Sequence, residues 1–394
     1  MANHPRVRSI EPIQLEQGEE AGFPRFLLRD SAGLTEEQLV VSLPALCLIE
    51  LADGSRSVPE IVVSLKERTG FIATEKVVKE MMDSLDQRFL LDNQRARRRL
   101  GQISPRPVRH GGACYPPAGG ELESFLDSLL GLDEPRNTDF KRASVLPHID
   151  YFRGHQAYRA GYQHLHGLRD RELTVVVLGI SHAFCRTPFI LTAKDFDTPL
   201  GVVETDTELV ELLARDLPFD PFLDEYNHIG EHSVELHAIL LKRLCPRAKI
   251  VPILCRSFHE AVLGKHSPLQ LPGVNEFVRN LTHIRDERPD LHFLASVDLA
   301  HKGLNFGESP LGRDFLNELE QRDRESLSGV EAGDADRFFA THQKDGGDRN
   351  YCGTPAIYTL LTLFPEKFEL HSYVQCNEHD LSSTVTVASA TIAE

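Results

Sequence analysis

The stretch LTVVVLGISHAF, residues 173–184, joins an almost continuous apolar run to a histidine. The run from Leu173 to Leu178 ends at Gly179, a pattern typical of a central strand in a sheet that is covered on both faces. His182 follows shortly after. In α/β sheets, ligands bind just beyond the carboxyl ends of the strands. The stretch therefore predicts a buried strand with a site residue at its end.

Three similar runs lie elsewhere in the chain: ASVLP at 143–147, KIVPIL at 249–254 and LHFLASV at 291–297. Helical periodicity lies before or between them, as in residues 121–130 and 151–166. Strands that alternate with helices predict an α/β fold whose central sheet is covered by helices on both faces.

Two of these runs also end in side chains that could bind a metal ion. Pro147 is followed by His148, and Val297 is followed by Asp298 and, three residues later, by His301. A single histidine after a strand is usually an ordinary loop residue, but three such coincidences favour a site. His148 and His182 belong to different strand and helix units, so the fold must bring them together. Two imidazoles with one anionic ligand and open positions suit iron(II) chemistry.

Six ordered motifs make residues from about 105 to 393 resemble the Memo family, the B component of the AmmeMemoRadiSam group. They are GGACYPP (111–117), LPHIDYFRG (146–154), LGISHAF (178–184), GEHSVELHAILL (230–241), SVDLAHKG (296–303) and YCGTPAIY (351–358). The resemblance implies a fold similar to class III extradiol dioxygenases, with a mixed α/β sheet. It also implies metal binding by His148, His182 and Cys352, with iron(II) or copper as the metal.

The residues around Cys352 alone allow two interpretations of this cysteine. A buried, inert thiol is one, and a ligand is the other, which the resemblance favours. Pro355 could begin a helix whose N-terminus lowers the pKa of Cys352. The same resemblance places His232, Asp298 and His301 along the pocket, where we expect them to contact substrate or move protons. His232 opens a predicted helix and could equally cap neighbouring loops.

Two departures from the family pattern bear on the substrate. The family's PHAGY element is Pro147-His148-Ile149-Asp150-Tyr151 here, which places a carboxylate close to a ligand, and its GPSHH element loses the second histidine to Ala183. The expected ligands are intact, but the substrate of a relative does not carry over. A thiolate ligand also differs from the carboxylate of true dioxygenases, so dioxygenase activity is not assumed.

The N-terminal part has a different pattern. Short strands are expected at 23–28 and 39–43, helices at 43–51, from Ser57 to about 68, and at 75–87, and a closing strand at 88–91. This small winged-helix unit resembles the PqqD-type peptide-recognition module found beside radical SAM enzymes. Its second helix carries Glu60 and Glu67 beside Lys66 and Arg68, so it offers no basic reading face, and a peptide ligand is expected instead. The alternative is a helical appendage that only packs on the main domain.

We therefore expect a PqqD-like domain at 1–92, a linker at 93–110 and a Memo-like domain at 111–394. The linker holds six arginines and two prolines, a composition more typical of a solvated tether than of a functional patch.

The composition excludes several functions. The formal charge of −16 disfavours nucleic-acid binding. No apolar run approaches the roughly 20 residues that cross a bilayer, and no signal peptide is evident, so we expect a cytoplasmic protein without a membrane partner. The seven cysteines form no CxxC pair, which favours reduced thiols.

We thus expect a metal-dependent redox protein that acts with a radical SAM enzyme and an AMMECR-like protein on an unidentified substrate. A non-catalytic adaptor that binds metal or docks a peptide is the alternative, and the residues leave open whether the protein is an enzyme. A hydrolase is disfavoured, because no GxSxG elbow occurs and Cys352 has no base near it in sequence.

Overall fold

A computed structural model describes residues 4–15, 24–30, 32–35, 37–133, 139–169, 171–378 and 381–393. The chain forms two compact units. The first contains the residues up to Ser104 together with the short segments 183–185 and 226–230, and the second contains the remainder.

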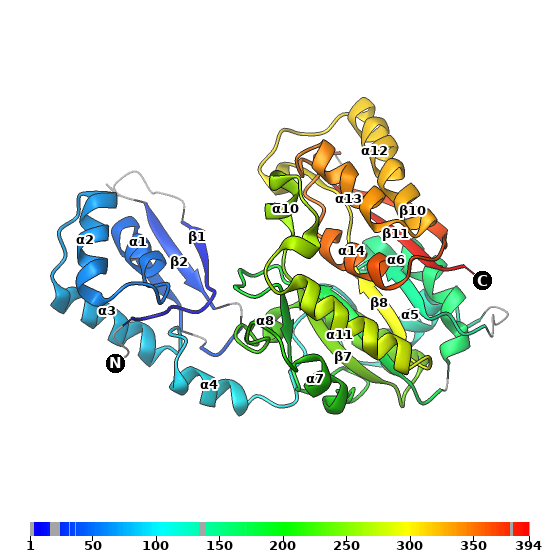
Figure 1. Ribbon diagram of the computed structural model, residues 1–394, viewed down its shortest axis with the longest axis horizontal. Coiled ribbons are helices and arrows are strands. Elements are labelled where there is room, and N and C mark those ends of the chain that lie inside the picture. The colour runs from blue at the N-terminus through cyan, green and yellow to red at the C-terminus, as the bar shows by residue number, and fades with distance from the viewer. Residues whose placement is uncertain are drawn as a thin grey trace. The chain divides into compact units, whose positions relative to one another are not determined.

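The first unit combines a small sheet with helices. Its antiparallel sheet has the order β1-β2-β3 among the described residues. The elements are β1 (Glu11–Gln14), β2 (Arg25–Arg29), β3 (Leu39–Ser42), α1 (Leu43–Leu51), α2 (Val58–Thr69), α3 (Glu75–Gln87), α4 (Gln94–Gly101) and α8 (Asn227–Gly230) (Figure 1). Ile61, Leu65 and Val78 are buried in its core.

The helices expected at 43–51, 57–68 and 75–87 are confirmed. Helix α2 shows why the prediction was accurate. Ser57 and Glu60 cap its N-terminus reciprocally, and Gly70 ends it in a left-handed conformation with φ 73°.

Two local expectations in the first unit are wrong. Residues 88–91 form a turn in place of a closing strand, and only Leu91 makes an isolated bridge, to Val7. Part of the expected linker is helical, because Asn93 caps α4 through the backbone N–H groups of Arg95 and Ala96. The exact domain boundaries and the PqqD-like assignment stay predictions.

The second unit is built on a mixed sheet of eight strands within the described residues, which confirms the predicted α/β class. The order is β10-β11-β4-β8-β5-β7-β6, and β9 pairs with β11. The strands are β4 (Ala143–Leu146), β5 (Thr174–Ile180), β6 (Phe189–Leu191), β7 (Lys249–Cys255), β8 (His292–Ser296), β9 (His301–Gly303), β10 (Phe368–Asn377) and β11 (Ser383–Ile392). Strands β4, β8, β5 and β7 are parallel neighbours, and the other pairs are antiparallel.

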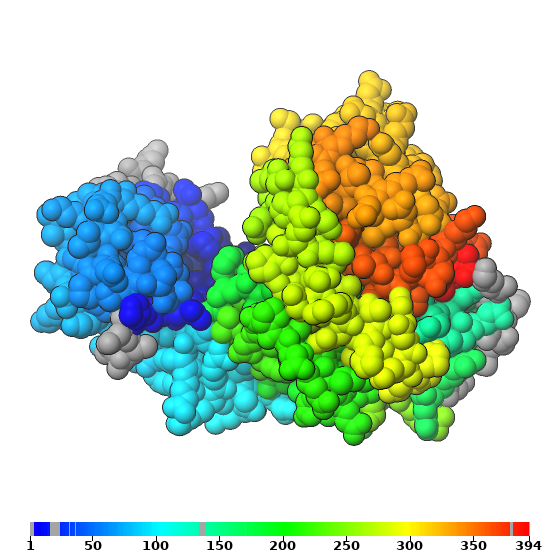
Figure 2. Space-filling view, in the orientation of Figure 1, coloured from blue at the N-terminus to red at the C-terminus, as the bar shows by residue number. Residues whose placement is uncertain are grey.

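Helices cover both faces of this sheet. One face carries α5 (Gly120–Leu130), α6 (Tyr151–Tyr162) and α9 (His232–Leu244). The other carries α7 (Thr207–Leu213), α11 (Val274–Glu287) and α14 (Thr354–Leu363), and the remaining helices are α10 (His259–Gly264), α12 (Arg313–Ala332) and α13 (Ala335–Lys344). Short 3-10 turns occupy Gln163–Leu168, Pro268–Gln270 and Leu304–Phe306. In the space-filling view, α11, in yellow-green, lies at the surface of the second unit that faces the viewer (Figure 2).

No helix among the described residues is both long enough and apolar enough to span a bilayer.

The strand order decides where a site can form. Because β8 lies between β4 and β5 and all three run parallel, their carboxyl ends meet at one edge of the sheet. The loops that leave these three ends are the ones in which the sequence places His148, Asp298 and His182.

Candidate metal centre

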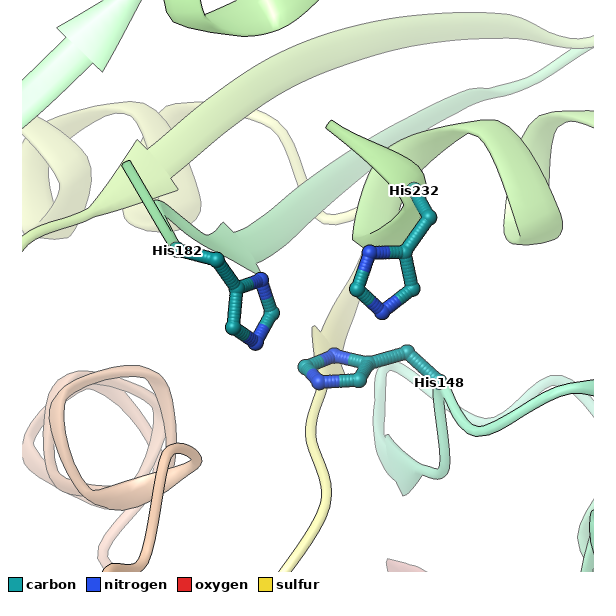
Figure 3. Close-up of side chains that lie close together, drawn as sticks. All are labelled: His148, His182 and His232. Carbon is teal, nitrogen blue, oxygen red and sulfur yellow. The ribbon is translucent and has the colours of Figure 1, made fainter. Parts of the chain in front are cut away.

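Three imidazole rings converge at this edge. His148 follows β4, His182 follows β5, and His232 is the first residue of α9. One ring nitrogen of each residue lies within 4.8 Å of the corresponding atoms of the other two. The ring centroids are 4.8 to 5.2 Å apart, and the rings turn toward one another (Figure 3). These three side chains could hold one metal ion.

Glu231 orients two of the rings. Its carboxylate caps α9 by accepting hydrogen bonds from the backbone N–H groups of His232 and Ser233, at 2.9 and 3.0 Å. The same carboxylate lies 3.0 Å from Nδ1 of His182 and 3.1 Å from Nδ1 of His232. An Nδ1–H that donates to a carboxylate leaves Nε2 with a free lone pair. Both rings thus offer Nε2 to an ion.

His148 is oriented in the same way by different groups. Its Nδ1 lies 2.9 Å from the carbonyl oxygen of Ser296, at the end of β8. The backbone N–H groups of His148 and Ile149 donate to Oδ1 of Asp298, at 2.9 and 3.0 Å, and fix the loop. The Nε2 atom of His148 again remains as the ligand atom.

Cys352 lies next to His148 but is not one of the three side chains whose ligand atoms all lie within 4.8 Å of one another. Its Sγ lies 3.3 Å from Nε2 of His148 and 3.5 Å from the carbonyl oxygen of Asp298. Gly353 lets its loop approach the residues directly after β8, because a Cβ at this position would lie 2.6 Å from Cβ of Val297. Pro355 stands in the first turn of α14, as expected.

The charges in the metal-free protein follow from burial and from Glu231. Burial opposes ionisation of Glu231, but His182 and His232 outweigh it and hold the pKa of Glu231 well below its usual value. The surroundings disfavour a charged His182, yet Glu231 and Cys352 raise the pKa of that ring well above its usual value. Burial lowers the pKa of His148 well below its usual value, so this ring is neutral.

The expectation that a helix N-terminus lowers the pKa of Cys352 is wrong for the metal-free protein. Burial raises the pKa of this thiol, and the hydrogen bond and charge of His182 offset the effect only in part. A cationic metal ion is what would favour the thiolate here.

Asp298 and His301 stand beside the cluster. Asp298 is buried, and its Oδ2 lies 3.9 Å from Nε2 of His148. Nδ1 of His301 lies 3.1 Å from the carbonyl oxygens of Leu299 and Asn350, so it ties the loop after β8 to the loop that precedes Cys352. Both residues support the positions of candidate ligands.

The structure adds two functional features that the sequence reasoning missed. His232 lies as close to the shared centre as the two predicted histidines, although we assigned it to substrate contact or proton transfer. The sequence does not predict a role for Glu231 in the site. The feature that could have indicated one is its position as a carboxylate directly before a helix that begins with a histidine.

The carboxylate of Asp150 does not join the ligands. It caps α6 by accepting a hydrogen bond from the N–H of Arg153, and it pairs with that residue's guanidinium at 2.5 Å. The carboxylate at this position therefore serves as a helix cap and is not one of the candidate ligand groups.

The donor set fits a transition metal. Imidazole nitrogens suit iron, copper and zinc, and a thiolate favours softer ions over magnesium or calcium. Each histidine has an acceptor on its second nitrogen, which is the usual arrangement of metal-bound imidazoles. The residues present therefore fit the metal that the resemblance implies.

Comparisons with known proteins find similar sequences over most of the chain. The model of a family described as Memo-like protein matches residues 106–393. A MEMO1 family protein of Aquifex aeolicus is 27% identical over 328 residues, which cover 79% of this chain and 83% of the relative. A MEMO1 family protein of Thermus thermophilus is 26% identical over 317 residues, covering 79% and 91% of the two chains. One from Schizosaccharomyces pombe is 27% identical over 325 residues, covering 73% and 98%.

Proposed function

Because the chain belongs to the Memo-like protein family, we propose that it is a metal-dependent redox protein with one iron or copper ion bound by His148, His182 and Cys352. The observation that carries the proposal is the group of three imidazoles, His148, His182 and His232, with the sulfur of Cys352 3.3 Å from Nε2 of His148. A redox-active ion held there would supply electron transfer and Lewis acidity.

The remaining residues have separate tasks in this proposal. The Nδ1 of His232 is engaged by Glu231, so its Nε2 is free to exchange a proton with a substrate beside the ion. Asp298 holds the loop that carries His148, and His301 holds the loop that precedes Cys352. His232 is also the alternative third ligand, since its ring nitrogen lies within the same group.

Metal binding to single variants tests this assignment. The protein is purified without oxygen and loaded with iron(II) or, separately, copper(I), and the metal content and X-ray absorption are measured. We expect a metal–sulfur distance near ~2.3 Å in the wild type. The sulfur signal should vanish in Cys352→Ser, and His232→Gln should retain both the metal and the sulfur signal. Metal bound by nitrogen alone in the wild type would refute the role of Cys352.

A second function, docking of a peptide, is favoured by a feature of the first unit. A cavity of about 410 Å³ lies among the N-terminal residues, the start of α2, one face of α3 and residues 91–93. In an adaptor, this unit would recruit a partner and the metal centre would perform no turnover. Tight metal binding, together with no oxygen or substrate consumption under any tested condition, would favour the adaptor.

We further propose, on the family resemblance, that a radical SAM enzyme and an AMMECR-like protein act together with this chain. Coexpression with each candidate partner, followed by size-exclusion chromatography, tests the association. Deletion of residues 1–92 should weaken capture of the radical SAM enzyme if the first unit recruits it. An unchanged complex would assign recruitment to the second unit.

A further inference from the structure

A buried ion pair lies next to the metal centre and is not among the proposed ligands. The side chains of Arg106 and Glu235 are both 0% exposed, and the guanidinium of Arg106 donates a hydrogen bond to the carboxylate of Glu235. Another nitrogen of the same guanidinium donates to the carbonyl oxygen of Glu231 at 2.6 Å. Arg106 therefore contacts the residue whose carboxylate orients His182 and His232.

Glu235 holds a whole segment against α9. Its carboxylate accepts further hydrogen bonds from three groups of residues 106–115, which we call the strap: the backbone N–H of Arg109 at 3.1 Å, the backbone N–H of His110 at 2.9 Å and the hydroxyl of Tyr115 at 2.5 Å. Burial opposes ionisation of Glu235, but Arg106 and Tyr115 outweigh it and lower the pKa of this carboxyl. A charged carboxylate at a buried position depends on its donors. The strap supplies all the donors named here.

The strap reaches the metal centre at a second point. The ring of His110 stands edge-on to the ring of His232, with their centroids 5.6 Å apart. The N-terminal part of the first unit ends at Ser104. The strap is therefore the segment through which the chain enters the second unit, and it contacts the metal centre there.

We infer that Arg106 is a positioning residue of the metal centre, and that it couples the attachment of the strap to the affinity for metal. The inference rests on the proposed function, because it takes His182 as a ligand. With the strap in place, Arg106 fixes the backbone of Glu231, and the carboxylate of Glu231 in turn orients His182. If metal binds more tightly with the strap attached, bound metal must by linkage hold the strap more firmly.

Hydrogen exchange of the full chain, measured with and without zinc(II), tests this coupling. Zinc is the probe because it binds nitrogen and sulfur ligands and has no redox chemistry. We expect saturating zinc to slow exchange about tenfold in a peptide that contains the N–H groups of Arg109 and His110. A peptide from α7, which carries no candidate ligand, should slow by less than about twofold. Equal slowing of both peptides, or unchanged exchange of the strap, would overturn the inference.

A conservative variant tests Arg106 itself. Arg106→Lys keeps a positive charge beside Glu235 but replaces the planar fork that serves two acceptors with a single ammonium group. We expect zinc affinity, measured against a chelator of known affinity, to fall about tenfold and the slowing of exchange to be lost. Arg8→Lys is the matched control, because Arg8 is also buried and pairs with Asp30 in the first unit. Wild-type affinity in Arg106→Lys, or an equal loss in Arg8→Lys, would contradict the assigned role.

A double variant separates positioning from folding. Removing one partner of a buried ion pair leaves an unpaired charge, whereas removing both charges does not. Arg106→Met combined with Glu235→Gln should therefore fold, as urea unfolding would show. It should still bind zinc about tenfold more weakly, because the contact with the carbonyl of Glu231 is absent. Undiminished affinity in the folded double variant would show that Arg106 serves stability alone. If both variants fail to fold, hydrogen exchange of the wild type still decides the question.

The inference and the proposed function fail in different experiments. If the metal–sulfur signal is present but zinc does not slow exchange of the strap, the metal centre stands and the role of Arg106 is wrong. If zinc slows exchange of the strap but the metal is bound by nitrogen alone, the role of Cys352 is wrong, and Arg106 positions a centre formed by the three histidines.

Discussion

Replacing Glu231 by glutamine tests whether this carboxylate holds the metal centre together. The carboxylate faces five N–H groups: the backbone N–H and Nδ1 of His182, the backbone N–H and Nδ1 of His232, and the backbone N–H of Ser233. An amide has one acceptor oxygen, and its NH₂ group would face a donor wherever it is placed. Glu231→Gln therefore loses the charge and leaves at least one N–H group facing another donor.

The expected size follows from the position of the change. Removing the partner of a metal-bound imidazole typically weakens metal affinity by about 10- to 100-fold, which is roughly 1.4 to 2.7 kcal/mol. Because Glu231 orients one proposed ligand, His182, we expect a loss within this range. The predicted ligands remain in place, so the metal–sulfur distance should persist once the variant is saturated.

Competition with a chelator measures the effect. The metal-free protein is titrated with cobalt(II) against a chelator of known affinity, and the apparent Kd of Glu231→Gln is compared with that of the wild type. Asp206→Asn is the control, since it also converts a helix-capping carboxylate to an amide, at α7, which carries no candidate ligand. Affinity within twofold of the wild type in a folded Glu231→Gln protein would refute the argument.

Three further predictions concern stability and the Cys352 loop. Burial lowers the pKa of His292 to about 4, below its unfolded value near 6.5, so stability should fall by roughly 3 kcal/mol as the pH falls through this range. Urea unfolding of His292→Gln should show a shallower pH dependence, and an equal slope would contradict this. Gly353→Ala would force the loop from the residues directly after β8 and should weaken cobalt binding about tenfold, whereas Gly312→Ala meets no atom and should not. Leu178→Ala, at a fully buried position of β5, should cost about 2–5 kcal/mol in urea unfolding; a cost below ~1 kcal/mol would contradict the central placement of β5.

Much of the fold was predictable, because its central strands have a strong local pattern. The apolar run at 173–178 became β5, and the runs at 143–147, 249–254 and 291–297 became β4, β7 and β8. These strands are covered on both faces, so almost all of their consecutive residues are apolar, and this pattern can be recognised in the sequence. The hairpin of β10 and β11 was not predicted. Strand β11 buries serine and threonine side chains, including Thr386 and Ser389, whose burial depends on pairing with distant strands.

The site was predictable only as a list of donors. The sequence placed His148, His182, Asp298 and His301 after three strands, and the family motifs added Cys352 and a pocket position for His232. Which of them meet was not contained in that list. The structure brings His232 into contact distance of the other two rings and turns Asp150 to a helix cap.

The amino-acid sequence alone determined the chemistry that is available: imidazole and thiol donors, each placed by a local pattern at the end of a strand or the start of a helix. Only the tertiary structure decided their assembly, because it inserts β8 between β4 and β5 and points the N-terminus of α9 at the same edge. Strand order and helix packing depend on contacts between residues up to about two hundred positions apart, such as Cys352 with His148. Local patterns in the sequence do not predict such contacts.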